Sequence, residues 1–328
     1  MALKDILENN ALMMLIAFVF GLALGGFPSH NGDIAMLSLG IVMSLSLGGL
    51  KLRGIKLREQ AKSVMTAMLM CFVVSAFFTI ILSFLFSDPS IRMGWILVAA
   101  VPSAIAVIPF TYLLRGDLQF SLVASAVIYI ASIVITPLIT LTFMGTPIDQ
   151  LTLLWYVAVL IFLPLAASRF LARVPMTGRS RTIFINLAFF VMFFAITGSN
   201  RSAFFNEPLL VLSLLGVAAA RTFIVGSAVE YFAQRLGVKR ERRISLVLFS
   251  TYKNTGMAAA LAAVLIGDMA AIPATVCLAI EVIWFVTLTR VIYPKDEGAS
   301  EKVIRPEAIR PPSSRTSKEL ARWLRGGR

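Results

Sequence analysis

The residue types on which most enzymes and metal sites depend are nearly absent from this sequence. It contains a single histidine, His30, and only two cysteines, Cys71 and Cys277. Metal sites and general acid–base catalysis draw mainly on clusters of these residues, and no nucleophile–base pair stands out. Both cysteines lie in apolar runs, where we interpret them as small buried hydrophobic residues and not as a disulfide framework. We therefore expect no enzyme, no metal and no cofactor.

Charged residues are also scarce, at 14% of the chain against 58% hydrophobic residues. The mean hydropathy of +0.86 is far above that of a soluble domain. Most of the apolar runs approach the ~20 residues that a helix needs to cross a bilayer. We predict an all-α integral membrane protein with ten transmembrane helices, at 11–28, 34–50, 63–86, 93–114, 118–144, 151–171, 182–199, 208–233, 244–267 and 270–293.

The basic residues are unevenly distributed among the loops. With the N-terminus inside, the loops 51–62, 169–181 and 234–243 are rich in lysine and arginine, whereas the external loops hold only Arg92 and Arg201. The positive-inside rule then places both termini in the cytoplasm and the protein in the cell (inner or plasma) membrane. The net charge of +13 fits contact with anionic membrane lipids better than nucleic-acid binding. Residues 294–328, rich in proline, serine and basic residues, are expected to form a disordered cytoplasmic tail.

Two of the predicted spans contain helix-breaking residues at their centres. The fourth carries Pro102 and Pro109, and the ninth carries Lys253, Asn254 and Gly256. Irregular backbone inside a membrane is tolerated only where protein or a water-filled cavity satisfies it. A matched pair of interrupted helices points to a transport site, and an odd number of spans in each half predicts two five-helix inverted repeats.

Three ionisable residues fall near the middle of predicted spans, namely Arg221, Lys253 and Glu281. One interpretation is an ion pair between Arg221 and Glu281 that only fixes helix packing. Lys253 would then be an uncompensated buried cation, and a small organic anion carried as substrate can supply the missing charge. Ser121 and Ser125 share one helix face; they can ligate an ion or hydrogen-bond back to the preceding turn.

At these positions the sequence resembles a known family. The stretch Pro102-Ser103-Ala104, followed by Thr111 to Asp117, and the stretch Lys253 to Ala262 are similar to two hallmark segments of the bile acid:sodium symporter superfamily. The similarity covers spans 3–5 and 8–10, and the other spans match only in hydropathy. We expect a divergent member of the bacterial or archaeal type.

The resemblance implies a division into two domains and a mechanism of alternating access. Residues 61–145 and 206–293 would form a core domain in which helices 4 and 9 cross at their unwound centres. Residues 1–60 and 146–205 would form a panel domain beside it. The implied substrate-binding residues are Pro102, Ser103, Ala104, Pro109, Thr111, Asn254, Thr255 and Gly256. Ser121, Ser125 and Asn254 would be remnants of ion sites, and Lys253, Glu281 and Arg221 would carry the coupling charge.

The departures from the family pattern concern the sodium sites. Where sodium-coupled members have a Ser-Asn pair, this chain has Val107 and Ile108, and where they have a glutamate and a glutamine it has Phe249 and Lys253. A hard cation needs several oxygen ligands, so we expect the usual sodium sites to be lost. Lys253 would act as a substitute cation or as a proton-coupling group, with a proton favoured over sodium as the coupling ion.

Two other functions remain open at this stage. One is a metalloid efflux permease of the arsenite type, because arsenite permeases share the superfamily fold. Those permeases resemble one another around a cysteine in the break of the fourth span, and this chain has no cysteine between Gly94 and Leu114. The other is a non-transporting membrane sensor or interaction protein on the same scaffold.

Overall fold

The computed structural model describes residues 3–47, 57–144, 149–171, 173–174 and 176–294. In these residues the chain is helical and forms no β-strand. It divides into two compact units, Met1–Phe285 and Val286–Arg328, and the candidate functional site belongs to the first. The predicted tail, 294–328, lies outside the described residues except for its first residue.

Six of the described helices are long and apolar enough to cross a membrane. They are Ala61–Ser83, Leu118–Met144, Leu151–Leu171, Gly178–Ser199, Pro208–Arg235 and Asp268–Ile292. Shorter apolar helices cover Leu12–Leu24, Asn31–Ser46 and Thr255–Leu265. The chain is thus a multi-pass membrane protein in which ten spans and an inverted repeat stay predictions.

The helices follow the predicted apolar runs in order. Their bounds are α1 Leu3–Glu8, α2 Asn10–Leu24, α3 Asn31–Leu47, α4 Leu57–Met68, α5 Ala76–Ser83, α6 Pro89–Ala100, α7 Val107–Leu113, α8 Leu118–Met144, α9 Gln150–Leu171, α10 Gly178–Ser199, α11 Arg201–Asn206, α12 Pro208–Ala219, α13 Val225–Arg235, α14 Arg240–Thr251, α15 Thr255–Leu265 and α16 Asp268–Thr287. The prediction that the first run extends to residue 28 is wrong. Gly25 has a left-handed backbone (φ 89°) and caps α2, because glycine adopts this conformation without a steric penalty.

Two long helices change their winding without being broken. Leu69–Ser75 forms a π-helical segment, η1, between α4 and α5, and Ala220–Ile224 forms another, η2, between α12 and α13. A further such segment, η3, covers Leu288–Ile292 in the second unit. A π-helical turn widens the helix and is often found at functional sites. Both segments of the first unit contain residues of the site described below, Cys71 in η1 and Arg221 in η2.

The two predicted breaks are present. The helix α6 ends at Ala100 because Val101 precedes a proline and is extended, and α7 starts only at Val107. In the second break Tyr252 is extended, and α15 starts at Thr255. The side chain of Asn254 caps α15 by accepting a hydrogen bond from the backbone N–H of Met257 at 3.1 Å.

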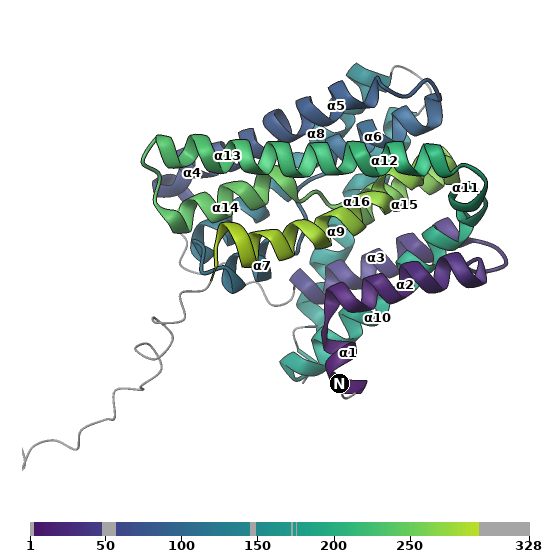
Figure 1. Ribbon diagram of the computed structural model, residues 1–328. Coiled ribbons are helices and arrows are strands. Elements are labelled where there is room, and N and C mark those ends of the chain that lie inside the picture. Colours follow the sequence, from purple (N-terminus) through teal and green to yellow (C-terminus); the bar gives the residue numbers. More distant parts are fainter. Residues whose placement is uncertain (1–2, 48–56, 145–148, 172, 175, 295–328) are drawn as a thin grey trace, which may run out of the picture. The chain divides into compact units, whose positions relative to one another are not determined.

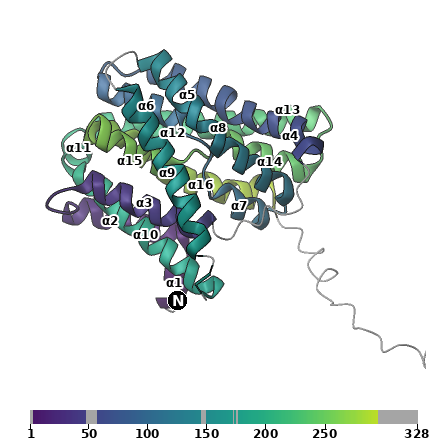
Figure 2. The same ribbon diagram turned by 180° about the vertical axis from the view of Figure 1, so that it is seen from behind.

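The helices α2, α3 and α10 lie side by side within the first unit (Figures 1 and 2). Between α2 and α10 the backbones approach so closely at Gly26 and Gly198 that a side chain at Gly198 would have no room. The helix α15 packs against α3, α6 and α10, whereas α14 packs against α13, α7, α8 and η1. The two halves of the second broken helix, α14 and α15, therefore contact different sets of helices.

Candidate functional site

The two broken helices meet at their interruptions and satisfy each other's backbone. Ser103 and Lys253 form an isolated antiparallel bridge. The N–H of Ala104 donates to the carbonyl of Tyr252 at 3.0 Å, and the N–H of Asn254 donates to the carbonyl of Pro102 at 2.8 Å. Backbone groups freed from the two helices thus find partners in protein, as the membrane interior requires.

Lys253 extends from this bridge into a fully buried position. Its Nζ donates to the carbonyl of Val101, at the end of α6, at 2.8 Å, and to the carbonyl of Cys71 in η1 at 2.9 Å. The sulfur of Cys71 lies 3.5 Å away, and the ring of Phe72 lies 5.1 Å from Nζ. The ammonium group therefore caps the carbonyl end of one half-helix, where the helix dipole is negative.

Arg221 makes a corresponding contact at the end of α14. Its Nη2 donates to the carbonyl of Thr251 at 2.7 Å, and its Nη1 lies 3.2 Å from the sulfur of Cys277. The carboxylate of Glu281 lies 3.6 Å from Nη1, so the expected ion pair is present. Tyr252 adds a bond from its hydroxyl to the carbonyl of Glu281 at 3.0 Å. A carboxylate thus accompanies this cation, whereas none of the ion pairs among the described residues includes Lys253.

Comparison with protein families gives a match over residues 10–289, to the SBF-like CPA transporter family. The chain belongs to this family. The match covers most of the chain, and it confirms the resemblance to the bile acid:sodium symporter type. No curated protein matches the chain. Membership of a transporter family makes transport, and not catalysis, the activity to be explained at the crossover.

Four of the residues that this family resemblance assigns to substrate line the crossover. Ser103 is fully buried, and its hydroxyl has no hydrogen-bond partner. Asn254 is 7% exposed and donates from Nδ2 to the hydroxyl of Tyr129 on α8 at 2.9 Å. Thr255 is buried, as is Gly256, where an added side chain would meet Met192 of α10. The hydroxyl of Ser103, whose backbone is paired with that of Lys253, is thus the unused one among these side chains.

The other residues that the resemblance assigns to substrate differ in how deeply they are buried. Pro102 is buried in the bridge, Ala104 is partly exposed, and Pro109 lies on an exposed position of α7. Thr111 is fully buried and donates to the carbonyl of Val107 at 2.7 Å and to the hydroxyl of Ser121 at 3.0 Å. The hydroxyl of Thr111 therefore has protein partners, whereas the hydroxyl of Ser103 has none.

Three of the positions to which the resemblance assigns sodium ligands hold apolar residues, namely Val107, Ile108 and Phe249. Val107 and Phe249 are both fully buried, and the ring of Phe249 packs edge-on against Phe120 at 5.8 Å. Ser121 belongs to a chain of hydroxyls, because it also donates to Ser245 of α14 at 2.9 Å. Ser125 is buried, but its hydroxyl has no partner.

Several contributors to the site carry no signal in the sequence. Cys71 and Cys277 were expected only as small buried residues, and both are free and buried. Each lies against one of the two buried cations, which sequence spacing does not reveal. Tyr129 and Tyr252 were likewise not predicted, although a tyrosine hydroxyl buried in a membrane helix generally needs a polar partner.

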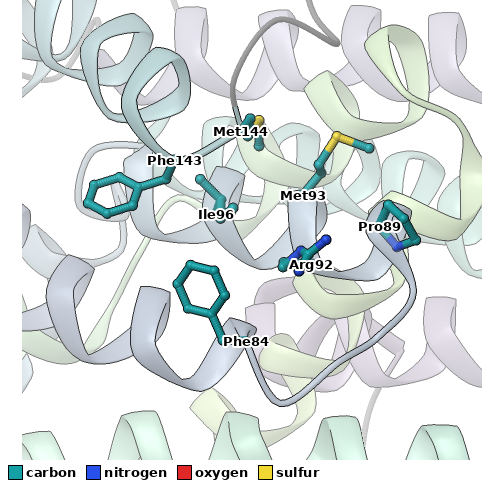
Figure 3. A pocket seen from close by; sticks show the side chains of 7 residues that line it. All are labelled: Phe84, Pro89, Arg92, Met93, Ile96, Phe143 and Met144. Carbon is teal, nitrogen blue, oxygen red and sulfur yellow. The ribbon is translucent and has the colours of Figure 1, made fainter.

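A cavity of about 210 Å³ lies elsewhere, near the start of α6 and the end of α8 (Figure 3). It is lined by Phe84, Pro89, Arg92, Met93, Ile96, Phe143 and Met144. The guanidinium of Arg92 lies 6.0 Å from the ring of Phe84, among otherwise apolar side chains. This cavity shares no residue with the crossover, so it does not identify the transport site.

Proposed function

We propose that this protein is a secondary active transporter of a small organic anion, working by alternating access. The observation that carries the proposal is the ammonium of Lys253, which is fully buried at the crossover and has no carboxylate partner among the described residues. A buried charge without a counter-ion is unfavourable, and an anion bound beside the crossover relieves it. The proposed binding residues are Ser103, Asn254, Thr255 and Gly256, with Pro102 and Ala104 shaping the backbone.

The proposed coupling does not use sodium. Val107 and Phe249 bring carbon atoms to positions where a sodium ion would need oxygen, and Ser125 offers an isolated hydroxyl. The ammonium of Lys253 instead occupies a position between two carbonyl oxygens, which supports its role as a substitute cation. The proposed coupling ion is a proton.

The division into a core and a panel domain is part of the same proposal. The helix α15 packs against α3 and α10, which belong to the proposed panel. At Gly256 the absence of a side chain brings α15 close to Met192 of α10. A substrate site at this contact would open and close as the two domains rock. We also propose that both termini are cytoplasmic and that the protein resides in the cell membrane.

Two measurements test the proposed function. Purified protein is screened for thermal stabilisation by a panel of organic anions, and uptake into proteoliposomes is then measured with sodium and proton gradients imposed separately. Asn254→Ala and Thr255→Ala should weaken uptake, whereas Thr142→Ala, at an exposed position of α8, should not. Normal uptake by both crossover variants would place the site elsewhere.

The same assay addresses the two alternatives. Uptake or efflux of arsenite without any response to organic anions would support a metalloid permease. The absence of any transport, with binding of a protein partner retained, would support a sensor. The buried cations favour the organic anion over both.

A further inference from the structure

The charges buried inside the described part of the molecule do not cancel. Among its buried side chains only three are ionisable as cation or carboxylate, namely Arg221, Lys253 and Glu281, with exposures of 1%, 0% and 5%. Two cations therefore face one anion. All three gather around the ends of the interrupted helices, so the excess positive charge is a property of the crossover.

The contacts of Lys253 match the charged form of its amino group. An ammonium has three N–H donors, and three acceptors surround this one: the carbonyls of Val101 and Cys71 and, at 3.5 Å, the sulfur of Cys71. A neutral amine has only two N–H donors and would need the thiol of Cys71 to donate to its lone pair. The face of Phe72 at 5.1 Å adds a further group that attracts a cation.

The carboxylate of Glu281 is committed to the other cation. Its Oε1 lies 3.6 Å from Nη1 of Arg221, and this is the only ion pair of Glu281 among the described residues. Glu281 thus compensates Arg221, and the charge of Lys253 remains.

We infer that the transported species is a monovalent anion and that the protein is an exchanger. Its binding site changes from one side of the membrane to the other only when an anion is bound. One negative charge cancels the excess at the crossover, whereas a dianion would reverse it. During alternating access the site is sealed from water on both sides, and sealing an uncompensated charge is unfavourable. The empty carrier therefore reorients slowly and the loaded carrier rapidly. This inference rests on the proposed function.

The orphaned hydroxyl of Ser103 is consistent with this interpretation. Its side chain is fully buried beside the bridge and has no partner in the structure. A buried hydroxyl without a hydrogen bond is rare and calls for an explanation. An anion at the crossover supplies an acceptor for it, so the same ligand would remove both the unpaired charge and the unpaired donor.

The test compares exchange with net uptake in proteoliposomes that contain the full chain. The probes are two pairs of anions matched in their carbon skeletons, gluconate with glucarate and benzenesulfonate with benzenedisulfonate, and the membrane potential is clamped. We expect vesicles preloaded with a monoanion to take up the labelled monoanion at least tenfold faster than vesicles without internal anion. The dianion of each pair should enter at least tenfold more slowly. Equal rates with and without internal anion, or preference for the dianion, would overturn the inference.

Variants that change the charge at the crossover sharpen this test. Glu281→Gln removes one negative charge and should shift the preference toward the dianion, whereas Lys253→Met removes the excess positive charge and should abolish anion uptake with and without preloading. A thiolate at Cys71 or Cys277 would supply a second negative charge without any carboxylate. The double variant C71S/C277S should therefore keep the monoanion preference; its loss would contradict the charge assignment.

The outcomes separate this inference from the proposed function. Net uptake of an anion as fast as exchange would leave an organic-anion transporter standing and remove the exchange mode. Absence of transport of every probe, with no thermal stabilisation by any of them, would overturn both. If Glu281→Gln fails to fold, the comparison of preloaded and empty vesicles with the unaltered chain still decides the matter.

Discussion

The ends of the two interrupted helices are built alike and differ in one charge. At the end of α6 the carbonyl of Val101 accepts from Lys253, and at the end of α14 the carbonyl of Thr251 accepts from Arg221. Lys253 lies in the break between α14 and α15 and Arg221 lies in η2, and each touches one of the two cysteines. Only Arg221 has a carboxylate, Glu281, within ion-pair distance.

This difference separates two roles that a buried cation can have. Capping a half-helix requires hydrogen-bond donors, and both side chains provide them. A neutral donor would be enough for capping, so capping alone does not explain the charge of Lys253. At the end of α14 the charge is compensated within the protein, which fits a structural role. At the end of α6 it is not compensated, which fits a role in binding an anion.

The largest effect on stability is expected at the compensated end. Arg221→Met leaves the carboxylate of Glu281 buried without a partner and the carbonyl of Thr251 without a donor. Removing one partner of a buried ion pair typically costs about 3–5 kcal/mol. We expect a free energy of unfolding lower by this amount, measured as thermal or denaturant unfolding in detergent.

The double variant Arg221→Met/Glu281→Leu provides the control for this prediction. Replacing both charged partners with apolar side chains removes the stranded carboxylate, so at least half of the lost stability should return. If the double variant is as unstable as the single one, the pair does not have the structural role that we assign to it.

A smaller loss of stability is expected at the uncompensated end. Lys253→Met leaves the carbonyls of Val101 and Cys71 without their donor, and each unpaired carbonyl costs about 1–3 kcal/mol. The variant also removes a charge that had no counter-ion, and this offsets part of the cost. We expect a net loss of about 1–3 kcal/mol together with the loss of anion uptake. A variant that is less stable than Arg221→Met but still transports would reverse the comparison.

The comparison also shows how far the sequence predicts such a site. The breaks follow from local chemistry, because Pro102 forces Val101 into an extended conformation and Asn254 is a strong helix cap. The pairing of Arg221 with Glu281 follows from the cost of burying charges in a membrane. The partner of Lys253 does not follow, because the acceptor is the backbone of Cys71, 182 residues away, in a π-helical segment without a recognisable sequence signature.

Individual side-chain contacts also do not follow from the sequence, because they depend on how helices distant in the chain pack together. The resemblance assigns Thr111 to the substrate site, and the structure adds hydrogen bonds to its own helix and to Ser121 that the sequence does not predict. A threonine in a membrane helix commonly bonds back to its own preceding turn. The additional bond to Ser121 depends on the packing of α7 against α8. The burial of Phe249 against Phe120 likewise depends on how two distant helices meet.

A moderate effect is expected where the second break is tied to α8. Tyr129→Phe removes the hydroxyl that accepts from Nδ2 of Asn254, and a single neutral hydrogen bond contributes about 1 kcal/mol. Unfolding in detergent should show a loss of about this size, and anion affinity should fall because Asn254 is no longer fixed. Tyr156→Phe on α9 is the matched control and should change neither quantity. If anion affinity is unaltered in Tyr129→Phe, Asn254 does not contact the substrate.

The smallest effect should come from Ser125, one of the two serines that correspond to sodium ligands, and it tests whether an ion binds at this position. The hydroxyl of Ser125 has no partner, so Ser125→Ala removes an unsatisfied buried group and should change the free energy of unfolding by less than about 0.5 kcal/mol, in the stabilising direction. Ser121→Ala breaks bonds to Thr111 and Ser245 and should cost about 1 kcal/mol.

Sodium should stabilise neither variant nor the unaltered chain, because Val107 and Phe249 offer no oxygen ligand there. Thermal stabilisation of the unaltered chain by sodium but not by potassium, lost in Ser125→Ala, would show instead that an ion binds at this position and that Lys253 does not replace it.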